Sequence, residues 1–359
     1  MKFVRIKQFW IKLRLWANKH PKTAWISGSL AILLLSGVIT FFVLSRPATP
    51  EVVVKKIEPK PKVIYYSPLT GKTVTNEAAT KIPVTGIMIE NSPDARPQSG
   101  LKKSGVVFEA IAEGGITRFL VLYQQEKPTI IGPVRSLRFY DIDWLAAFDA
   151  SIGHVGGSAA SLKEIRNGSY RDLDQFFNAG SYWRATDRYA PHNVYTNFKN
   201  LDALNKSKGY KTSIFTGFNR VDGKPEKTPT AKIINITISS TLFNNSYIYN
   251  PKTNTYNRSQ AGEPHLDREY GQISPSVVIA MRVNEKTVLE DGYRQSITTI
   301  GSGKAVIFQN GIAIKAIWHK KDKLHQITFT DVKGKDVPLI RGQTWISAVP
   351  NDGGDVTWK

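Results

Sequence analysis

The longest uncharged apolar run of the chain lies near the N-terminus, from Ala24 to Leu44. Its length matches the ~20 residues that a helix needs to cross the hydrocarbon core of a bilayer. We therefore predict one transmembrane helix over residues 24–45. A cleavable signal peptide is the alternative, but its apolar core spans only about 7–15 residues before small residues at the cleavage site. The longer run here ends in FFVLSRPATP and favours an uncleaved single-pass anchor.

The polar positions on either side of this run indicate its orientation. Residues 1–23 contain no acid and seven cations: Lys2, Arg5, Lys7, Lys12, Arg14, Lys19 and Lys22. The positive-inside rule places this basic tail in the cytoplasm and the bulk of the chain outside the cell. Residues 46–64 are rich in proline and lysine, which is typical of an extended, semi-rigid linker.

Between Ile82 and Gly209, apolar runs of strand length alternate with stretches of helical spacing. The run ASIGHVGG predicts a strand, and SAASLKEIRNG predicts a helix that Ser158 caps and Gly168 closes. The segments DLDQFF and FKNLDALNKSKG predict further short helices. Because strands alternating with helices indicate an α/β sheet, we assign residues 65–210 to an α/β (α+β) domain.

After Gly209 the pattern changes to short runs in which apolar and polar residues alternate. The tripeptides QNG and KGK lie between such runs as turns. This texture predicts a second, mostly antiparallel β domain over residues 230–359. Residues 211–229 form the predicted linker between the two domains.

Composition narrows the classes of partner. The chain has 359 residues and a formal net charge of +20, so an anionic partner is expected. Membrane topology and attraction to anionic lipid headgroups explain the cations of the N-terminal tail better than binding to DNA does. The chain has no helix-turn-helix, RNP or zinc pattern, and its bulk is predicted to lie outside, which argues against nucleic acid. Without any cysteine, disulfides, thiolate metal sites, cysteine nucleophiles and a lipid-modified N-terminal cysteine are excluded.

Arginines recur near the ends of the apolar segments between Glu113 and Asn193, where an α/β sheet places its ligand crevice. They are Arg118, Arg135, Arg138, Arg184 and Arg188. Guanidinium groups bind carboxylate or phosphate in a bidentate manner, so the set could converge on one polyanion. The alternative is that each arginine pairs with a local acid such as Asp141, Asp143, Asp174 or Asp187. For a single arginine we favour that pairing, but we expect at least two of the set to face a ligand.

The stretch HVGGSAASL carries a glycine turn between the predicted strand and helix. Backbone N–H groups at Gly156 and Gly157, aided by the helix dipole, can form a nest for an anion. Ser158 is expected to cap the helix, because GGS lacks the spacing of the G-x-S-x-G elbow of serine hydrolases. His154 is placed at the rim of this turn, with a purely structural role as the alternative.

The stretch APHNVYTN adds His192 and Asn193 to the candidates. His154 and His192 could form an acid–base pair or bind a metal. The six histidines of the chain show no H-x-H or HExxH spacing, so we predict neither a metal nor a cofactor. In the second half, GEPHLDREYG contains His265 and Asp267, which we interpret as a polar turn.

Several motifs occur together and in a fixed order: PVTGIMIENSPDARPQSGL, VVFEAIAEGGITRFLVLYQ, IGPVRSLRFYDID, HVGGS, DLDQ, RYAPHNVYTN, YNPKTNTYNRSQAGEPHLDREYG and GQTWISAVP. In content and order they resemble the YerB-like family of bacterial cell-envelope proteins over residues 65–359. The members are mostly described as candidate lipoproteins built from two domains of unknown function. The resemblance therefore implies an envelope location and two domains, but no catalytic residue. This chain departs from the lipoprotein pattern, because an apolar helix replaces the cysteine for a lipid anchor.

Three hypotheses for the function remain. The favoured one is a module that binds an anionic envelope ligand, such as a wall polymer, a glycan phosphate or a lipid-linked precursor. Its crevice would contain Arg118, Arg135, Arg138, His154, Gly156, Gly157, Ser158, Asp174, Arg184, Arg188, His192 and Asn193. The second is an enzyme that transfers an envelope glycan or phosphate, by analogy with LytR-CpsA-Psr transferases, with Asp174 as base or metal ligand. The third is a scaffold that recruits a protein partner through the β domain.

Overall fold

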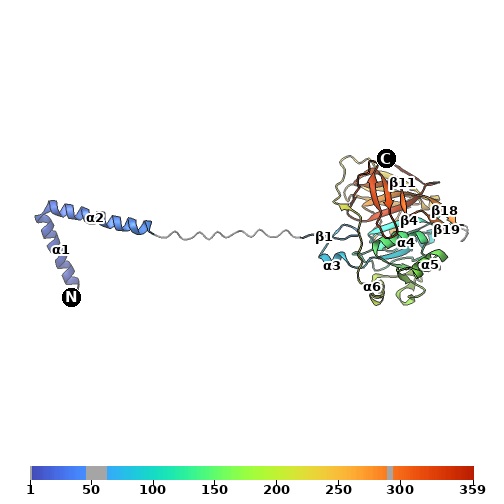
Figure 1. Cartoon of the computed structure of the whole chain (residues 1–359), viewed down its shortest axis with the longest axis horizontal. Helices are drawn as coiled ribbons and strands as arrows, with labels where there is room; N and C mark the ends of the chain where they lie inside the picture. The colour runs from blue at the N-terminus through green and yellow to red at the C-terminus, as the bar shows by residue number, and fades with distance from the viewer. Residues whose placement is uncertain (1, 46–62, 289–293) are drawn as a thin grey trace. The chain divides into compact units, whose positions relative to one another are not determined.

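The computed structural model describes residues 2–45, 63–288 and 294–359. The chain divides into two compact units between Lys62 and Val63. Most of the linker predicted at residues 46–64 falls on residues 46–62, outside the described residues. Figure 1 shows the elements of both units.

The described residues of the N-terminal unit, 2–45, form two helices, α1 (Lys2–Lys19) and α2 (Pro21–Leu44). Pro21 stands in the first turn of α2, where its missing N–H costs no hydrogen bond. In the described residues α2 is the one helix long and apolar enough to cross a membrane, with a mean hydropathy of 2.3 over its most apolar stretch. The predicted apolar helix is therefore present, and it begins three residues earlier than the sequence indicated.

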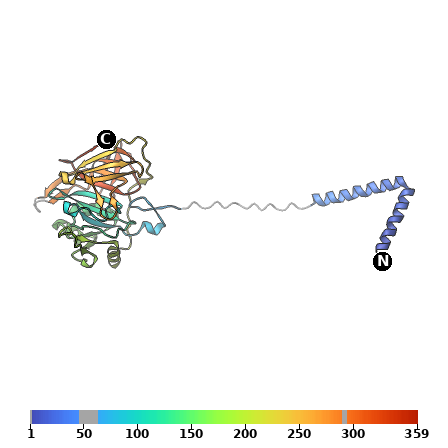
Figure 2. The same ribbon diagram turned by 180° about the vertical axis from the view of Figure 1, so that it is seen from behind.

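The second unit is built on a large mixed sheet (Figures 1 and 2). Its main path, in spatial order, is β22 (Thr328–Asp331), β21 (Ile312–Lys320), β20 (Gly301–Gln309), β17 (Val277–Val283), β24 (Thr344–Pro350), β4 (Val106–Glu113), β5 (Ile116–Tyr123), β3 (Thr85–Glu90), β6 (Ser151–His154) and β7 (Arg171–Asp174). The hairpin of β18 (Glu285–Val288) and β19 (Arg294–Ile297) attaches to β4 at Glu113. Strands from both halves of the sequence thus form one sheet.

Strand β24 joins the two halves. It runs parallel to β17 on one side and parallel to β4 on the other, with Ser347 opposite Glu109 and Trp345 opposite Val107. All seven residues of β24 are buried. Strands that pair in parallel on both edges and lie under cover on both faces are typical of the centre of a sheet.

A second, antiparallel sheet packs on the C-terminal strands. Its order is β14 (Glu263–Pro264), β13 (Thr255–Gln260), β12 (Asn245–Asn250), β11 (Ile233–Thr237) and β25 (Asp355–Trp358). Every second residue of β13 is buried, as expected when one face of a strand packs on a core. Tyr247 and Tyr256 of this sheet share a core with Val278 and Phe308 of the large sheet. These observations confirm the predicted strand-rich C-terminal part.

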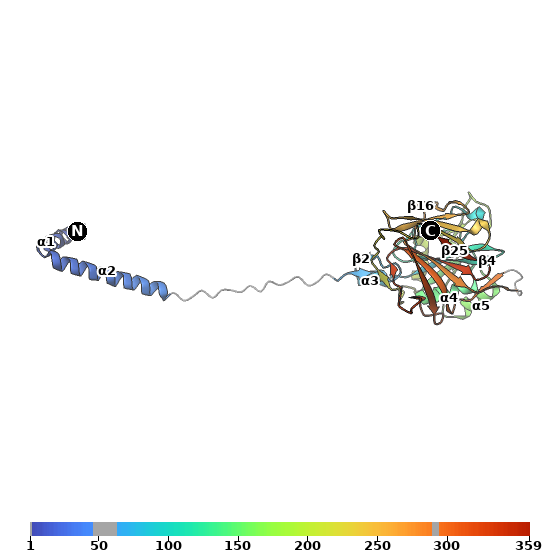
Figure 3. The same cartoon turned by 90° about the horizontal axis from the view of Figure 1, so that it is seen from above.

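Helices and short segments cover the N-terminal half of the large sheet. The covering helices are α4 (Phe139–Leu145), α5 (Ala159–Asn167) and α6 (Phe198–Ser207). The short helix α3 (Glu77–Thr80) buries no residue. The short strand pairs are β1 (Tyr65–Tyr66) with β2 (Thr73–Val74), β8 (Trp183–Arg184) with β9 (Val194–Tyr195), β10 (Arg220–Val221) with β23 (Leu339–Ile340), and β15 (Leu266–Asp267) with β16 (Gly271–Gln272). In Figure 3, α4 and α5 lie together on one side of the unit and β16 on the opposite side.

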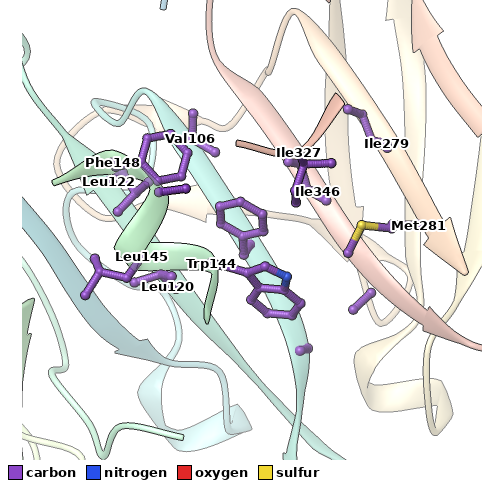
Figure 4. Close-up of a cluster of buried hydrophobic side chains, with 14 of the residues drawn as sticks. Val106, Leu120, Leu122, Trp144, Leu145, Phe148, Ile279, Met281, Ile327 and Ile346 are labelled. Carbon is purple, nitrogen blue, oxygen red and sulfur yellow. The ribbon is translucent and has the colours of Figure 1, made fainter. Parts of the chain in front are cut away.

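The core under α4 shows how the sequence builds this layer (Figure 4). Trp144 of α4 stacks on Phe108 of β4 with ring centroids 5.0 Å apart, and Phe148 packs edge-on against the same ring. Val107, the residue before Phe108 on β4, belongs to a separate core on the other face of the sheet. One predicted element is wrong: DLDQFF begins as strand β7, because Arg171–Asp174 pairs in parallel with β6.

Candidate functional site

The twelve predicted site residues lie in three separate clusters rather than along one crevice. The first cluster surrounds His154, the second surrounds Glu113, and the third lies between β3 and the loop that joins β8 to β9. Arg138 of the second cluster and Ser158 of the first line one hollow of about 270 Å³, whereas Arg188 and His192 of the third cluster line a different hollow of about 610 Å³. The structure therefore does not bring the twelve predicted residues together in one shared crevice.

The first cluster holds His154, Gly156 and Asp174. His154 is fully buried, so its predicted place at a rim is wrong. Its Nδ1 lies 2.8 Å from the carbonyl of Gly156, and its Nε2 lies 3.0 Å from Asp172. The N–H of Gly156 donates to the carboxylate of Asp174 at 3.1 Å, and Asp174 also pairs with Arg166 at 3.2 Å. The nest predicted for an anion is thus filled by a carboxylate of the protein itself.

Ser158 and Gly157 complete the turn after His154. The Ser158 hydroxyl accepts the Ser161 N–H at 3.2 Å, which confirms the predicted cap of α5. A side chain at Gly157 would meet the Ser161 hydroxyl at 2.6 Å and the Leu137 carbonyl at 3.0 Å. Glycine is therefore required here by close packing, and Ser158 has the structural role that the sequence favoured.

The second cluster places Arg118 and Arg138 on one carboxylate. Arg118 donates to Glu113 Oε1 at 2.9 Å, and Arg138 donates through Nε to Oε2 at 2.9 Å. Both guanidinium groups also donate to backbone carbonyls, of Ser136 and Leu137 respectively, at 3.0 Å. Burial alone would raise the pKa of Glu113, but the two cations outweigh it and lower this pKa to about 2. These two arginines are paired internally, as in the alternative stated from sequence.

The low pKa of Glu113 predicts a loss of stability in acid. The folded pKa is below the usual value of 4.5, so the stabilisation is complete above pH 4.5 and is lost as pH falls toward 2. From this shift we expect Glu113→Gln to lower the free energy of unfolding by up to about 3 kcal/mol at pH 7. The gap between the variant and the wild type should narrow between pH 5 and pH 2 in urea unfolding curves. A gap that is constant over this range would contradict the assignment.

The third cluster lines a hollow of about 610 Å³, which we call the arginine pocket. Its lining residues are Asp94, Arg96, Pro97, Asp187, Arg188, Tyr189, His192 and Arg268. Two of them, Arg188 and His192, belong to the predicted set. Arg96 and Arg268 were not singled out from sequence, and Arg268 comes from the C-terminal half. Arg268 forms an ion pair with Asp187 across the lining, at 2.5 Å.

The remaining two arginines of the pocket bind neutral oxygens. Arg188 donates to the backbone carbonyls of Asp94 at 2.8 Å and Pro97 at 2.7 Å. Arg96 donates to the carbonyls of Asn91 at 2.8 Å and Leu242 at 2.9 Å. Burial, and then the nearby Arg258 cation, lower the pKa of Arg96 to about 10, with Glu109 opposing them. No carboxylate within the described residues lies at ion-pair distance from either guanidinium group, so both retain positive charge for an anion.

His192 lies at the inner wall of the pocket against the buried carboxylate of Glu90. Its Nδ1 is 3.0 Å from Glu90 Oε1, and Arg135 forms an ion pair with the same oxygen at 3.2 Å. Ser92 also donates to Glu90 Oε1, at 2.9 Å. The other ring nitrogen of His192, Nε2, lies 3.9 Å from Asp94 Oδ2, an exposed carboxylate of the pocket lining. Glu90 therefore holds Nδ1 and leaves Nε2 on the pocket side.

Arg184 and Asn193 shape the loop that carries this wall. Arg184 donates to the Asn193 side-chain oxygen at 2.7 Å across the β8–β9 pair. The Asn193 amide donates to the carbonyls of Ala185 at 3.2 Å and Arg188 at 3.3 Å. These bonds fix the loop between the two strands. Both residues therefore position Arg188 and His192 rather than line the pocket.

A buried polar network lies behind Arg96 and was not predicted from the sequence. Arg258 is fully buried and donates to Glu109 Oε2 at 2.9 Å and to Gln260 at 2.9 Å, with further bonds to Asn245 and to Nδ1 of His265. His265 was interpreted as part of a polar turn, but Nε2 of its buried ring bonds Gln98 at 2.9 Å. Burial, followed by the cations of Arg258 and Arg96, lowers the pKa of His265 well below its usual range. The neutral ring thus accepts from Arg258 and donates to Gln98.

A larger hollow of about 750 Å³ lies elsewhere, beside α4 and β22. Its lining includes Asp149, Arg171, Ile214, Leu324 and His325. The charged groups there are already paired, Arg171 with Asp149 at 2.6 Å and His325 with Asp322 at 2.7 Å. In the described residues no group of three or more histidine or acidic side chains is arranged to hold a metal. Size alone therefore does not identify the site, and the arginine pocket has the more distinctive chemistry.

Comparisons with known proteins agree with this architecture. Residues 69–211 match the N-terminal domain, and residues 234–346 the C-terminal domain, of a protein family of unknown function, DUF3048. The Bacillus subtilis (strain 168) protein named "Putative lipoprotein YerB" is 32% identical over 290 residues, which cover 79% of this chain and 86% of that protein. The crystal structure of YerB from Bacillus subtilis matches with a TM-score of 0.73 and 30% identity, over 82% of this chain and 99% of that one.

The relative named as a lipoprotein and the apolar helix α2 both indicate association with a membrane. The N-terminal domain match covers the strands of one half of the large sheet, and the C-terminal domain match covers strands of the other half. The shared fold and the identity over most of both chains lead to one conclusion: the chain belongs to the YerB (DUF3048) family.

Proposed function

We propose that this protein binds an anionic ligand of the cell envelope in the arginine pocket, from a position outside the membrane to which α2 anchors it. One observation carries the proposal: Arg96 and Arg188 face a hollow of about 610 Å³ without a carboxylate partner within the described residues. A buried or half-buried guanidinium group without a counter-charge is costly, and an anion offsets that cost. His192 adds a ring nitrogen on the same side.

The pocket favours a phosphate-bearing polymer or lipid-linked precursor over a simple carboxylate. Planar guanidinium groups bind phosphate oxygens in pairs, and two of them from different segments suit a tetrahedral group. Tyr189 at the rim is 92% exposed, and a flat ring there can pack against a sugar or polyol unit. The ion pair of Arg268 with Asp187 limits the net positive charge, which suits one phosphate group rather than a long strand of nucleic acid.

A second candidate function, transfer or hydrolysis of such a phosphate, is favoured by one specific observation. Glu90 on Nδ1 of His192 sets the ring with Nε2 toward the pocket, which is the arrangement of a general base oriented by a carboxylate. Asp174, the base or metal ligand expected from sequence, accepts from the Gly156 N–H and pairs with Arg166 instead. An enzyme at this site would therefore use His192 and not Asp174.

Binding can be measured by calorimetry on the full chain in nanodiscs of phosphatidylcholine, with glycerol-phosphate oligomers as the probe. We expect Arg188→Gln and Arg96→Gln each to weaken binding about tenfold or more, since each removes a charged hydrogen-bond partner worth about 1.5–3 kcal/mol. Arg166→Gln is the matched control, because Arg166 is partly exposed and pairs with Asp174 outside the pocket. Equal affinities of all four proteins would refute the proposed site.

The same preparations separate the two functions. His192→Asn keeps a polar side chain of similar size but removes the base. If the protein is only a binding module, this variant binds nearly as the wild type does and no phosphate or glycan is released from the probe. Turnover by the wild type that His192→Asn abolishes, with binding kept, would instead identify an enzyme.

The mass of the chain purified from membranes tests the anchor, because an uncleaved α2 leaves the N-terminus intact.

A further inference from the structure

Helix α1 is a second charged surface, and the arginine pocket does not explain it. Its 18 residues contain six cations and no acid: Lys2, Arg5, Lys7, Lys12, Arg14 and Lys19. A cytoplasmic flank needs only a few such charges to orient a membrane span. Here they continue through a complete helix that also exposes large apolar side chains.

The aromatic side chains of α1 gather on one face. At 3.6 residues per turn, the spacing of Phe3, Ile6, Trp10 and Leu13 keeps these residues on one side of the helix. Phe9 and Trp16, seven residues apart, lie beside this row. All six side chains are exposed, from 41% for Leu13 to 89% for Phe3. We call this surface the aromatic face.

Five of the six basic residues border the aromatic face on its two sides, whereas the position of Lys2, four residues before Ile6, falls on the aromatic side at the start of the helix. Lys12 and Lys19, with Arg5, repeat every seven residues along one edge, and Lys7 and Arg14 do so along the other. Long basic side chains in this position can extend their charged ends to lipid headgroups while their stems cover apolar surface. The opposite side of the helix carries Gln8 and Asn18, together with the exposed aliphatic residues Val4, Ile11 and Leu15, and no aromatic ring.

We propose that α1 lies in the plane of the membrane surface, with its aromatic face in the acyl boundary and its basic edges on the anionic headgroups of the cytoplasmic leaflet. This inference rests on the proposed role of α2 as an uncleaved span. Tryptophan and phenylalanine are the side chains that prefer this depth, and Lys/Arg-bordered helices of this length bind anionic lipid.

A lipid surface fits α1 better than a protein or nucleic acid does. Only His20 separates the last residue of α1 from Pro21, the first residue of α2, so the apolar helix holds α1 close to the headgroups. The six cations complement a leaflet of negative surface potential, and each contributes about fivefold to partitioning. A single aromatic face between two basic edges matches a flat apolar boundary below a charged layer.

The chain has no cysteine, so single cysteines can report the position of each face. The full chain carrying Ile6→Cys or Gln8→Cys is labelled with a nitroxide and placed in nanodiscs of phosphatidylcholine with phosphatidylglycerol. We expect the label at position 6 to collide mainly with oxygen and the label at position 8 mainly with a water-soluble nickel complex. The ratio of the two collision rates should differ by about tenfold between the positions, as for side chains inside and outside the acyl boundary.

Charge is tested by the triple substitution Arg5→Gln, Lys12→Gln and Lys19→Gln, which should bring the label at position 6 into water. Lys199→Gln, Lys206→Gln and Lys208→Gln, on and after α6, form the matched control and should change nothing. Equal exposure of both labels to water in anionic nanodiscs would overturn the proposal. A label at position 6 that is shielded from both oxygen and the nickel complex would also overturn it, because such shielding indicates a protein partner. Recovery of a chain that lacks residues 2–45 would overturn both this proposal and the proposed anchoring by α2. The proposed ligand site in the arginine pocket would still be tested separately by the binding experiment.

Discussion

Replacing Glu109 by glutamine is expected to lower the free energy of unfolding by about 3–5 kcal/mol, the largest loss we predict for a single side chain. Glu109 and Arg258 are both fully buried and 2.9 Å apart. Glutamine keeps the size of the side chain but leaves the guanidinium charge of Arg258 in the interior without its carboxylate. Removing one partner of a buried pair is much more costly than removing an exposed one, because the remaining charge stays desolvated.

The neighbours of Glu109 add to the expected loss. Its Oε2 also accepts from the Trp345 ring at 2.9 Å and from Asn245 at 3.1 Å, while Oε1 accepts from Thr117 at 3.2 Å. The guanidinium group of Arg258 lies over the Trp345 ring, 4.4 Å from its centroid. Glutamine can accept at one oxygen only, so at least one of these donors loses its partner.

Urea unfolding of the full chain in detergent, followed by near-ultraviolet circular dichroism, measures the effect. Arg258→Met should also destabilise, and the double variant with Glu109→Gln should lose less than the sum of the two single losses, since both act on one network. Glu77→Gln is the control, because the Glu77–Lys81 pair is exposed and surface ion pairs contribute little to stability. A Glu109→Gln protein within about 0.5 kcal/mol of the wild type would show that the pair does not stabilise the fold.

Sequence reasoning succeeded where the determinant was local. The apolar helix, the Ser158 cap and the alternating strands of the second half depend on neighbours a few residues away, and the structure contains all three. The arginines do not converge because the tertiary structure gives them separate partners, among them Glu113 for Arg118, only five residues away. Arg138 pairs with the same Glu113, which lies 25 residues earlier in the chain. Arginine is therefore paired with a carboxylate in one cluster, whereas two arginines of the arginine pocket have no carboxylate partner within the described residues.

The buried network has a signal in the sequence, which is the position of Glu109. Glu109 stands in the middle of the apolar run VVFEAIAE, and a charged residue on a buried strand requires a buried partner. Only the three-dimensional structure could identify that partner, because Arg258 lies 149 residues away. The same limit applies to Arg96 and Arg268, which reach one pocket from opposite halves of the chain.

The second large effect concerns the two halves of the compact unit, which match separate family domains. We expect that residues 63–229 and residues 230–359, produced separately, do not fold cooperatively. Without β24, strand β4 loses its parallel partner from Val106 to Glu109, and without β4 the buried Arg258 loses its carboxylate. Each loss exceeds a few kcal/mol, whereas a domain has a net stability of about 5–15 kcal/mol in all.

Co-expression of the two halves should restore the fold, because residues 222–228 at the cut are exposed and take no part in the large sheet. The halves should then purify as a one-to-one complex with the near-ultraviolet spectrum of the uncut unit. The control is a cut before Val63, at the boundary between the two compact units, which should release residues 63–359 folded. A sharp, cooperative urea transition of either half alone would contradict this expectation. The boundary between the two family domains would then also be a folding boundary. The parallel pairing of β24 with β4 would be an interface between independent domains rather than the centre of one fold.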